Sequence, residues 1–158
     1  AYYTLPMITI AEVHGAAAGL GFSVAIGSDI LVAETPSKLA MNFIGIGLIP
    51  DGGGHFFMKE RVGTAKAKQL IWEGEVMDGD ETLSLGLIDY NVPEGAATAI
   101  VDQIVGKLLA SPIAAMIESK LILHKQKLPE LEGILAGEAA GHHGKCLCVR
   151  HCGGFPAD

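Results

Sequence analysis

The first 145 residues of this 158-residue chain contain no cysteine, and charged side chains are scarce throughout it. The three cysteines, Cys146, Cys148 and Cys152, all lie near the C-terminus. A disulfide framework for the body of the protein is therefore excluded. Charged residues make up 18% of the chain, below the usual share of ~25%. Because 49% of the residues are hydrophobic, disorder is also excluded as the main state.

Basic residues and long apolar runs are also in short supply. Lys and Arg total 11 against 18 Asp and Glu, which gives a formal net charge of −7. Nucleic acid is excluded as a partner, because binding to phosphate groups needs a basic surface. No apolar run reaches the ~18 residues of a membrane-spanning helix. The first residues lack the basic region of a secretory signal, so we expect a cytoplasmic protein without a membrane partner.

Glycine is the residue in excess, with 21 positions against a usual share of ~7%, which indicates tight turns and close backbone packing. A run rich in β-branched residues predicts a strand at 7–14. Further strands are expected at 30–33, 38–41 and 88–92, and a turn of small residues is expected at 15–21. Helices are expected at 22–27, 55–62, 64–72, 78–86, 95–109, 112–126 and 128–140. The pattern is typical of an α/β fold in one domain.

The C-terminal residues differ in character from the rest of the chain. His142, His143 and His151 lie among the three cysteines, and such side chains bind zinc in other proteins. Because paired C-x-x-C motifs and an apolar period are both missing, we expect no metal site there. We divide the chain into a core at 1–95, a helical region at 96–140 and an atypical tail at 141–158. The tail is interpreted as disordered or as a shifted reading frame.

The turn Gly19-Leu20-Gly21 is the first candidate binding site. Glycines at such a turn let a backbone N–H approach a ligand oxygen, for example a carbonyl that becomes an oxyanion. It fails as a dinucleotide-binding fingerprint, because Val24 stands where the third glycine is needed. A purely steric role in a tight turn remains the alternative interpretation.

Ser23 supports a second hypothesis, a serine acyl hydrolase. The segment 21–25, Gly-Phe-Ser-Val-Ala, resembles a nucleophile elbow with alanine in place of the last glycine. The segment 14–17, His-Gly-Ala-Ala, resembles the oxyanion loop of some esterases. The two motifs are only a few residues apart, whereas hydrolases supply them from separate strands. The alternative interpretation of Ser23 is a small residue that lines a close contact.

Asp51 stands directly before Gly52-Gly53-Gly54 and the helix expected at 55–62. An aspartate in front of a helix is commonly its N-cap. An acid beside an apolar pocket, here with Phe43 and Phe56 nearby, could instead transfer protons. The residues alone leave both interpretations open.

Taken together, these segments resemble the crotonase superfamily, the enoyl-CoA hydratases and isomerases. The resemblance runs from about Leu5 to Ala140 and rests on segments 8–21, 28–29, 46–54, 67–74 and 86–89. It implies a ClpP/crotonase-like spiral of ββα turns followed by C-terminal helices, of which this chain carries the C-terminal part. The resemblance also implies a homo-oligomer of three or six copies.

The same resemblance implies a chemistry. In this family an acyl-CoA thioester places its carbonyl oxygen between two backbone N–H groups, which stabilise an enolate. Leu20 is expected to supply one donor, with Gly19 and Gly21 beside the substrate, and no cofactor is expected beyond the coenzyme A of the substrate. The family's other donor comes from a loop upstream of the segment 7–14. We therefore expect this chain alone to be inactive, and a non-catalytic remnant is a further alternative.

The residues that depart from the hydratase pattern favour isomerisation. The positions of the two hydratase glutamates hold Ser23 and Phe43, which neither donate nor accept a catalytic proton but are expected to line the substrate pocket. Phe43 with the segment 46–51 resembles the isomerases of phenylacetate catabolism, which act on ring-epoxide and ring-opened CoA thioesters. In members of that group an aspartate falls at the position of Asp51. The resemblance thus implies that Asp51 is the catalytic acid/base.

Overall fold

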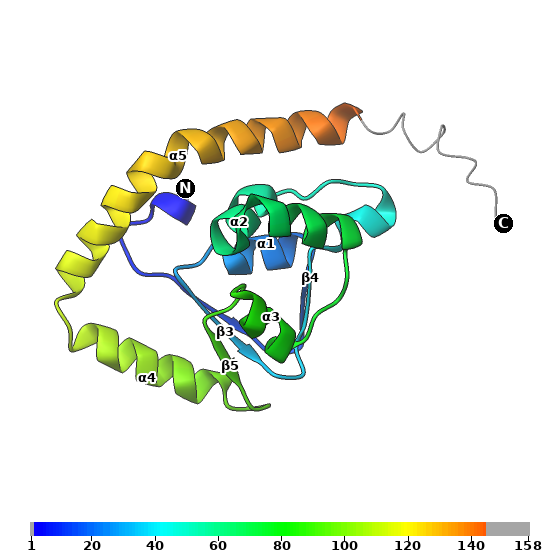
Figure 1. Ribbon diagram of the computed structural model, residues 1–158. Coiled ribbons are helices and arrows are strands. Elements are labelled where there is room, and N and C mark those ends of the chain that lie inside the picture. Colours follow the sequence, from blue (N-terminus) through cyan, green and yellow to red (C-terminus); the bar gives the residue numbers. More distant parts are fainter. Residues whose placement is uncertain (1, 145–158) are drawn as a thin grey trace.

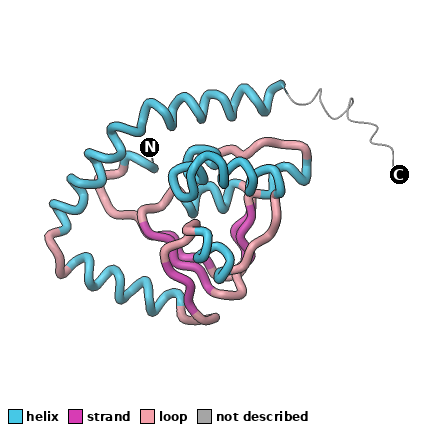
Figure 2. Tube along the Cα trace, in the orientation of Figure 1, coloured by secondary structure: helices cyan, strands magenta, loops and turns pink. Residues whose placement is uncertain are grey.

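The computed structural model describes residues 2–144 and shows a mixed α/β chain whose strands all precede the two long C-terminal helices (Figures 1 and 2). The strands are β1 (Ile10–Val13), β2 (Ala16–Ala18), β3 (Ile30–Glu34), β4 (Lys38–Ala40) and β5 (Tyr90–Val92). The α-helices are α1 (Leu20–Ile26), α2 (Gly54–Glu73), α3 (Gly79–Leu85), α4 (Ala97–Leu109) and α5 (Ile113–Gly144). Short 3-10 helices occupy η1 (Tyr2–Thr4) and η2 (Asn42–Ile46). The expected fold class is confirmed.

Strand β3 is the centre of a parallel sheet with the order β1-β3-β5. Its side chains alternate between two cores. Leu31 and Ala33 are fully buried in the larger core with α1 and α2, whereas Val32 is buried in a smaller core with α4. A parallel strand covered on both faces reads as a continuous apolar run, which explains why 30–33 is apolar throughout. Figure 1 shows α4 on one side of these strands and α1 with α2 on the other.

A second parallel pair, β2 and β4, was expected only in part. The segment 15–21 was predicted to be a turn, but Ala16–Ala18 forms a strand with Ala17 opposite Leu39. This prediction was wrong because three alanines have no β-branched side chains to indicate a strand. Ala17 is buried and Leu39 is inaccessible in the larger core. Tertiary packing, not local preference, therefore makes β2 extended.

Helix α2 combines the two helices expected at 55–62 and 64–72. Gly63 lies between them with φ 76° and ψ 162°, which is not helical, so the axis is kinked there. Helix α3 has the ends that its sequence predicts. Asp78 accepts a hydrogen bond from the N–H of Glu81, whose side chain accepts one from the N–H of Asp78, and Gly86 ends the helix in a left-handed conformation. This capping box fixes the first turn of α3.

Helix α5 is continuous where two helices, at 112–126 and 128–140, were expected. Pro129 lies inside it, and a proline removes one helical hydrogen bond and crowds the preceding turn. Leu128 and Leu131 flank it and pack against the larger core. The apolar contacts on both sides of Pro129 therefore keep the helix continuous through this residue.

The C-terminal boundary also differs from the expected one. The helix runs to Gly144 rather than ending at residue 140, so the first residues of the expected tail are helical. Residues 145–158, with all three cysteines and His151, lie outside the described part of the chain. Within residues 2–144, no single helix has both the length and the hydropathy to cross a membrane. The pair Ala97–Leu109 and Ile113–His142, bent by 100°, meets the length and composition criteria only jointly.

Candidate active site

The turn that leads into α1 exposes a free backbone amide at the predicted oxyanion position. Gly19 is the N-cap, with φ 56° and ψ −125°, a conformation that only glycine adopts readily. Its own N–H donates to the carbonyl oxygen of Ala40 at 2.9 Å, which ties the turn to β4. As the first residues of a helix, Leu20 and Gly21 have no intrahelical acceptor for their N–H groups, and no side chain of residues 2–144 caps this end of the helix. The Leu20 amide is therefore available to an oxygen of a ligand.

Phe43 forms the wall behind this turn. It lies on η2 and is buried. A Cβ atom added at Gly19 would lie 3.5 Å from Cζ of the Phe43 ring, so the ring contacts the turn directly. The sequence predicted Phe43 beside the substrate, and the structure brings it to Gly19.

Ser23 lies on α1 and is completely buried. Its hydroxyl donates at 3.4 Å to the carbonyl oxygen of Gly19 and lies 3.5 Å from Sδ of Met41. Neither partner is a base, and within residues 2–144 the Ser23 hydroxyl has no hydrogen bond to a histidine or a carboxylate. A serine nucleophile needs such a base. This environment matches the interpretation of Ser23 as a small residue in a close contact.

The glycine-rich loop places Asp51 next to the Leu20 turn. A Cβ atom added at Gly52 would lie 2.5 Å from Cδ1 of Leu20 and 3.6 Å from Cβ of Ser23. The loop is closed by a hydrogen bond from the N–H of Gly54 to the carbonyl oxygen of Asp51 at 3.0 Å. Asp51 Oδ1 is buried, and no donor in the described part of the chain bonds to it. A buried carboxylate oxygen without a partner is costly for folding, so it requires an explanation.

The capping interpretation does not supply that explanation. The N-cap of α2 is Gly53, not Asp51, and no local side chain caps it. The acceptor comes instead from α5, where Glu138 bonds to the N–H groups of Gly53 and His55. Sequence analysis missed Glu138 and His55. A helix that begins with glycines and lacks a local cap was the available signal, because its free N–H groups need acceptors from elsewhere.

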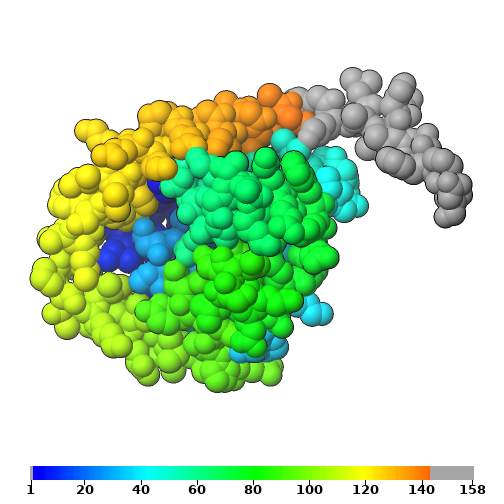
Figure 3. Space-filling view, viewed as in Figure 1, coloured from blue at the N-terminus to red at the C-terminus, as the bar shows by residue number. Residues whose placement is uncertain are grey.

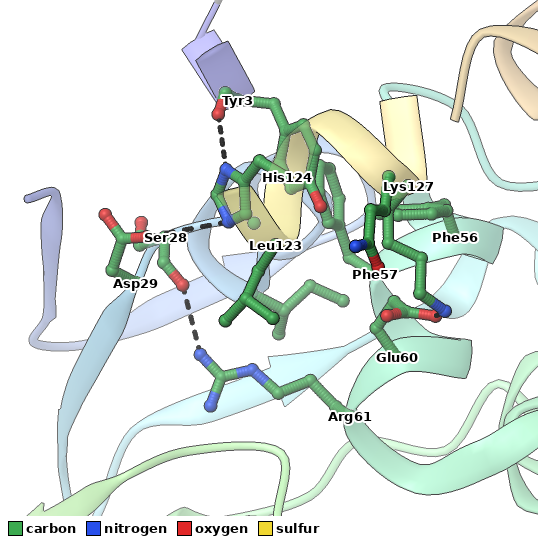
Figure 4. Close-up of a pocket in the computed structure, with 13 residues that line it drawn as sticks. Tyr3, Ser28, Asp29, Phe56, Phe57, Glu60, Arg61, Leu123, His124 and Lys127 are labelled. Atoms are coloured by element: carbon green, nitrogen blue, oxygen red, sulfur yellow. Dashed lines mark hydrogen bonds and ion pairs between the residues drawn. The ribbon is translucent and has the colours of Figure 1, made fainter. Parts of the chain in front are cut away.

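A separate cavity of about 440 Å³ lies between α2 and α5 (Figures 3 and 4). None of the predicted site residues lines it. The apolar part of its lining comes from Tyr3, Ile26, Phe56, Phe57 and Leu123. Its charged side chains are already paired, as Glu60 is with Lys127 and Arg61 with Asp89. We therefore place the candidate active site at the Leu20 turn and Asp51.

Tyr3 and His124 close one side of this cavity. Their rings are stacked with centroids 3.8 Å apart, and His124 Nδ1 lies 2.7 Å from the Tyr3 carbonyl oxygen (Figure 4). Burial, and then the carboxylates of Glu60, Asp29 and Glu130, raise the pKa of Tyr3 to about 12. The Tyr3 hydroxyl is thus protonated at neutral pH, which suits a structural role. Within residues 2–144, no group of three or more His, Cys, Asp or Glu side chains is arranged to hold a metal ion.

Comparison with known proteins gives consistent matches. A family model described as enoyl-CoA hydratase/isomerase matches residues 1–145. The chain is 48% identical over 139 residues to YhaR of Bacillus subtilis (strain 168), which carries the name of an enoyl-CoA hydratase/isomerase; the match covers 86% of this chain and 53% of YhaR.

Solved structures agree with this match. An enoyl-CoA hydratase from Mycobacterium avium subsp. paratuberculosis K-10 superposes with a TM-score of 0.86 at 32% identity, covering 92% of this chain and 59% of that one. An enoyl-CoA hydratase from Bacillus halodurans superposes with a TM-score of 0.81 at 26% identity, covering 89% and 56%. The chain thus spans little more than half the length of these relatives.

Proposed function

The chain belongs to the enoyl-CoA hydratase/isomerase family, and from that premise we propose that the protein in its full natural length moves the double bond of an acyl-CoA thioester by way of an enolate. The expected membership of the crotonase superfamily, and the fold that it implies, are confirmed. The family acts on acyl-CoA substrates. The narrower likeness to isomerases of phenylacetate catabolism remains a prediction.

One observation carries the proposal: a carboxylate oxygen of Asp51 is buried without a partner in the described residues, beside a turn that presents the unbonded amide of Leu20. The amide is a hydrogen-bond donor for a thioester oxygen that gains negative charge. The carboxylate is a base for the adjacent carbon atom. The base and one of the two oxyanion donors that enolate formation requires are thus present on adjoining loops.

The proposed reaction needs a single proton carrier. Asp51 removes a proton from the α-carbon of a β,γ-unsaturated thioester, and the electron pair moves onto the carbonyl oxygen that faces the Leu20 N–H. The same carboxyl group then returns the proton to the γ-carbon, and the double bond becomes conjugated with the thioester. Addition of water by the paired-carboxylate route needs a second acid/base, and Ser23 and Phe43 cannot provide one. Asp51 alone therefore fits isomerisation better than hydration.

We expect the protein, in the full length that its gene encodes, to isomerise vinylacetyl-CoA to crotonyl-CoA. The rate of this isomerisation should exceed the rate at which the protein hydrates crotonyl-CoA by roughly tenfold or more. The rise in ultraviolet absorbance of the conjugated thioester measures the first reaction, and its loss measures the second. Release of the coenzyme A thiol is followed in the same reactions. Faster hydration than isomerisation would overturn the proposal, and release of thiol would favour the serine hydrolase.

We also propose that the working protein is a homo-oligomer, as the family resemblance implies. Large apolar side chains on α5 support this, because the neighbouring residues Ile122 and Leu123 are each more than half exposed, and exposed apolar surface is enriched at interfaces. We expect sedimentation equilibrium to show association that weakens when Ile122 and Leu123 are both replaced by Ser. A monomer over the whole accessible concentration range would contradict this.

A further inference from the structure

The start of α2 receives its hydrogen-bond acceptor from a residue more than 80 positions away. Glu138 on α5 accepts hydrogen bonds from the N–H groups of Gly53 at 2.8 Å and His55 at 3.2 Å. Its Oε1 also lies 2.8 Å from Nδ1 of His55. Because a carboxylate is the acceptor, the His55 ring carries a proton on Nδ1. Three donors from one helix turn therefore converge on the two oxygens of one carboxylate.

This contact is buried rather than a casual surface pair. Only 4% of the Glu138 side chain is exposed, and a carboxylate at that depth is stable only when its oxygens are paired. Close packing fixes α5 on either side of it. A Cβ atom added at Gly53 would lie 3.2 Å from Cδ1 of Leu131, and one added at Gly141 would lie 2.4 Å from Cδ1 of Ile49. The position of α5 is thus coupled to the loop between Ile49 and His55.

Asp51 lies within that loop, two residues before the amide that Glu138 holds. The N–H of Gly54 bonds to the Asp51 carbonyl oxygen, so a rotation of the Gly53 peptide unit would also turn the Asp51 backbone. Within residues 2–144, no hydrogen bond at Asp51 Oδ1 fixes the direction of this side chain. Its orientation therefore depends on the backbone that carries it.

We propose that Glu138 is a positioning residue, which aims the Asp51 carboxylate at the substrate by holding the amides of Gly53 and His55. The inference rests on the proposed function, because it assigns the acid/base role to Asp51. The His55 ring also orients the Glu138 carboxylate, because its Nδ1 donates to Oε1, the oxygen that accepts from the His55 N–H. In reactions that depend on orientation, a displacement of about 1 Å can cost ~10²-fold in rate.

Glu138→Gln is the principal test, measured as isomerisation of vinylacetyl-CoA by the longest natural form of the protein. An amide has only one acceptor oxygen, so at least one donor at the start of α2 then faces an NH₂ group. We expect kcat to fall roughly tenfold or more, with KM changed by less than about twofold. Glu132→Gln makes the same substitution at an exposed position of the same helix and is expected to leave both constants unchanged.

The same substitution in an Asp51→Asn background separates positioning from general destabilisation. If Glu138 acts through Asp51, Glu138→Gln should lower kcat by less than about twofold once Asp51 is already replaced. An equal loss in both backgrounds, or no loss in either, would overturn the inference. A different result, an unchanged kcat in Asp51→Asn alone, would refute the proposed function and the inference with it.

Two variants of His55 test the positioning role of Glu138 if Glu138→Gln does not fold. His55→Leu removes the ring donor but leaves both backbone hydrogen bonds to Glu138. His55→Asn restores a donor, because the amide nitrogen of Asn occupies the place of Nδ1 relative to Cβ. We expect His55→Leu to lower kcat several-fold and His55→Asn to recover most of it. Equal kcat values in the two variants would overturn the inference.

Discussion

Asp51→Asn is expected to reduce kcat for vinylacetyl-CoA by about 10²-fold or more, the usual contribution of a general acid/base. Asn has nearly the size of Asp but does not take a proton from carbon. The positions where a hydratase would carry its glutamates hold Ser23 and Phe43, so no other group of the turn replaces the lost carboxylate. KM should change much less than kcat, because the Leu20 amide and the apolar wall remain in place.

The same substitution should not lower the stability of the fold. Asp51 Oδ1 is buried without a hydrogen bond from the described residues, so the native state contains a buried polar oxygen whose lost hydration is poorly compensated. Asp51 is not the N-cap of α2 either, since Glu138 serves that helix end. A neutral amide should therefore leave the free energy of unfolding unchanged or raise it. Loss of activity with no loss of stability is typical of a catalytic group.

Steady-state kinetics and denaturant unfolding on the same preparations test both halves of this prediction. Asp102→Asn, at an exposed position of α4, is the matched control and should change neither quantity. If Asp51→Asn unfolds the protein while its folded fraction keeps full activity, Asp51 is a structural residue and the proposed acid/base role is wrong.

Elements whose signals are local could be predicted from the sequence. The apolar run at 30–33 predicted the strand β3, and the segment that begins at Asp78 predicted the start of α3. Elements that depend on partners could not. Ala16–Ala18 is a strand because it pairs with β4, and α5 passes Pro129 because its flanking leucines pack on the core.

The residues of the candidate site were likewise predictable where the signal is local and not predictable where it depends on a distant partner. The glycine turn with Leu20, and the loop with Asp51, were predicted, because glycines and an acid in short motifs carry both geometry and chemistry. The structure then brought Phe43 to Gly19 and Leu20 to Gly52. The role of Glu138 could not be predicted, because no residue near it in the sequence indicates that it contacts the start of α2, 85 residues away. In the amphipathic pattern of α5, it reads as one more polar position.

A large loss of stability is expected when the ion pair between Lys120 and Asp29 is broken, because this pair holds α5 against the N-terminal half of the chain. Lys120 Nζ lies 2.7 Å from Asp29 Oδ2 and donates at 2.7 Å to the carbonyl oxygen of Met7. The same Asp29 oxygen accepts from the N–H and the hydroxyl of Thr9, each at 2.7 Å. The Lys120 side chain is only 8% exposed. One carboxylate thus joins α5, the segment before β1 and the turn before β3.

Asp29→Asn is expected to lower the free energy of unfolding by about 2–3 kcal/mol, less than the ~3–5 kcal/mol of a fully buried ion pair that loses one partner, because the Asp29 side chain is 19% exposed. Lys120 cannot turn into water without undocking α5, and the Met7 carbonyl does not neutralise its charge. Asp102→Asn, which removes an exposed carboxylate, should change the free energy of unfolding by less than about 0.5 kcal/mol. Urea unfolding at neutral pH measures both.

The dependence of this loss on pH distinguishes the ion pair from a packing effect. Burial raises the pKa of Asp29. The hydrogen bonds from Lys120 and Thr9, together with the charge of Lys120, lower this pKa by more than burial raises it, so the pKa lies below its usual value of 3.8. A carboxyl group with a lower pKa in the folded state stabilises it above the unfolded-state pKa, and this stabilisation disappears as the pH falls through the folded-state pKa. The stability difference between the natural protein and Asp29→Asn should therefore be fully present well above pH 3.8 and should shrink as the pH falls through that value and below it. A difference that persists unchanged at more acidic pH would mean that Asp29 acts through its shape and neutral hydrogen bonds, and that its charge contributes nothing to the docking of α5.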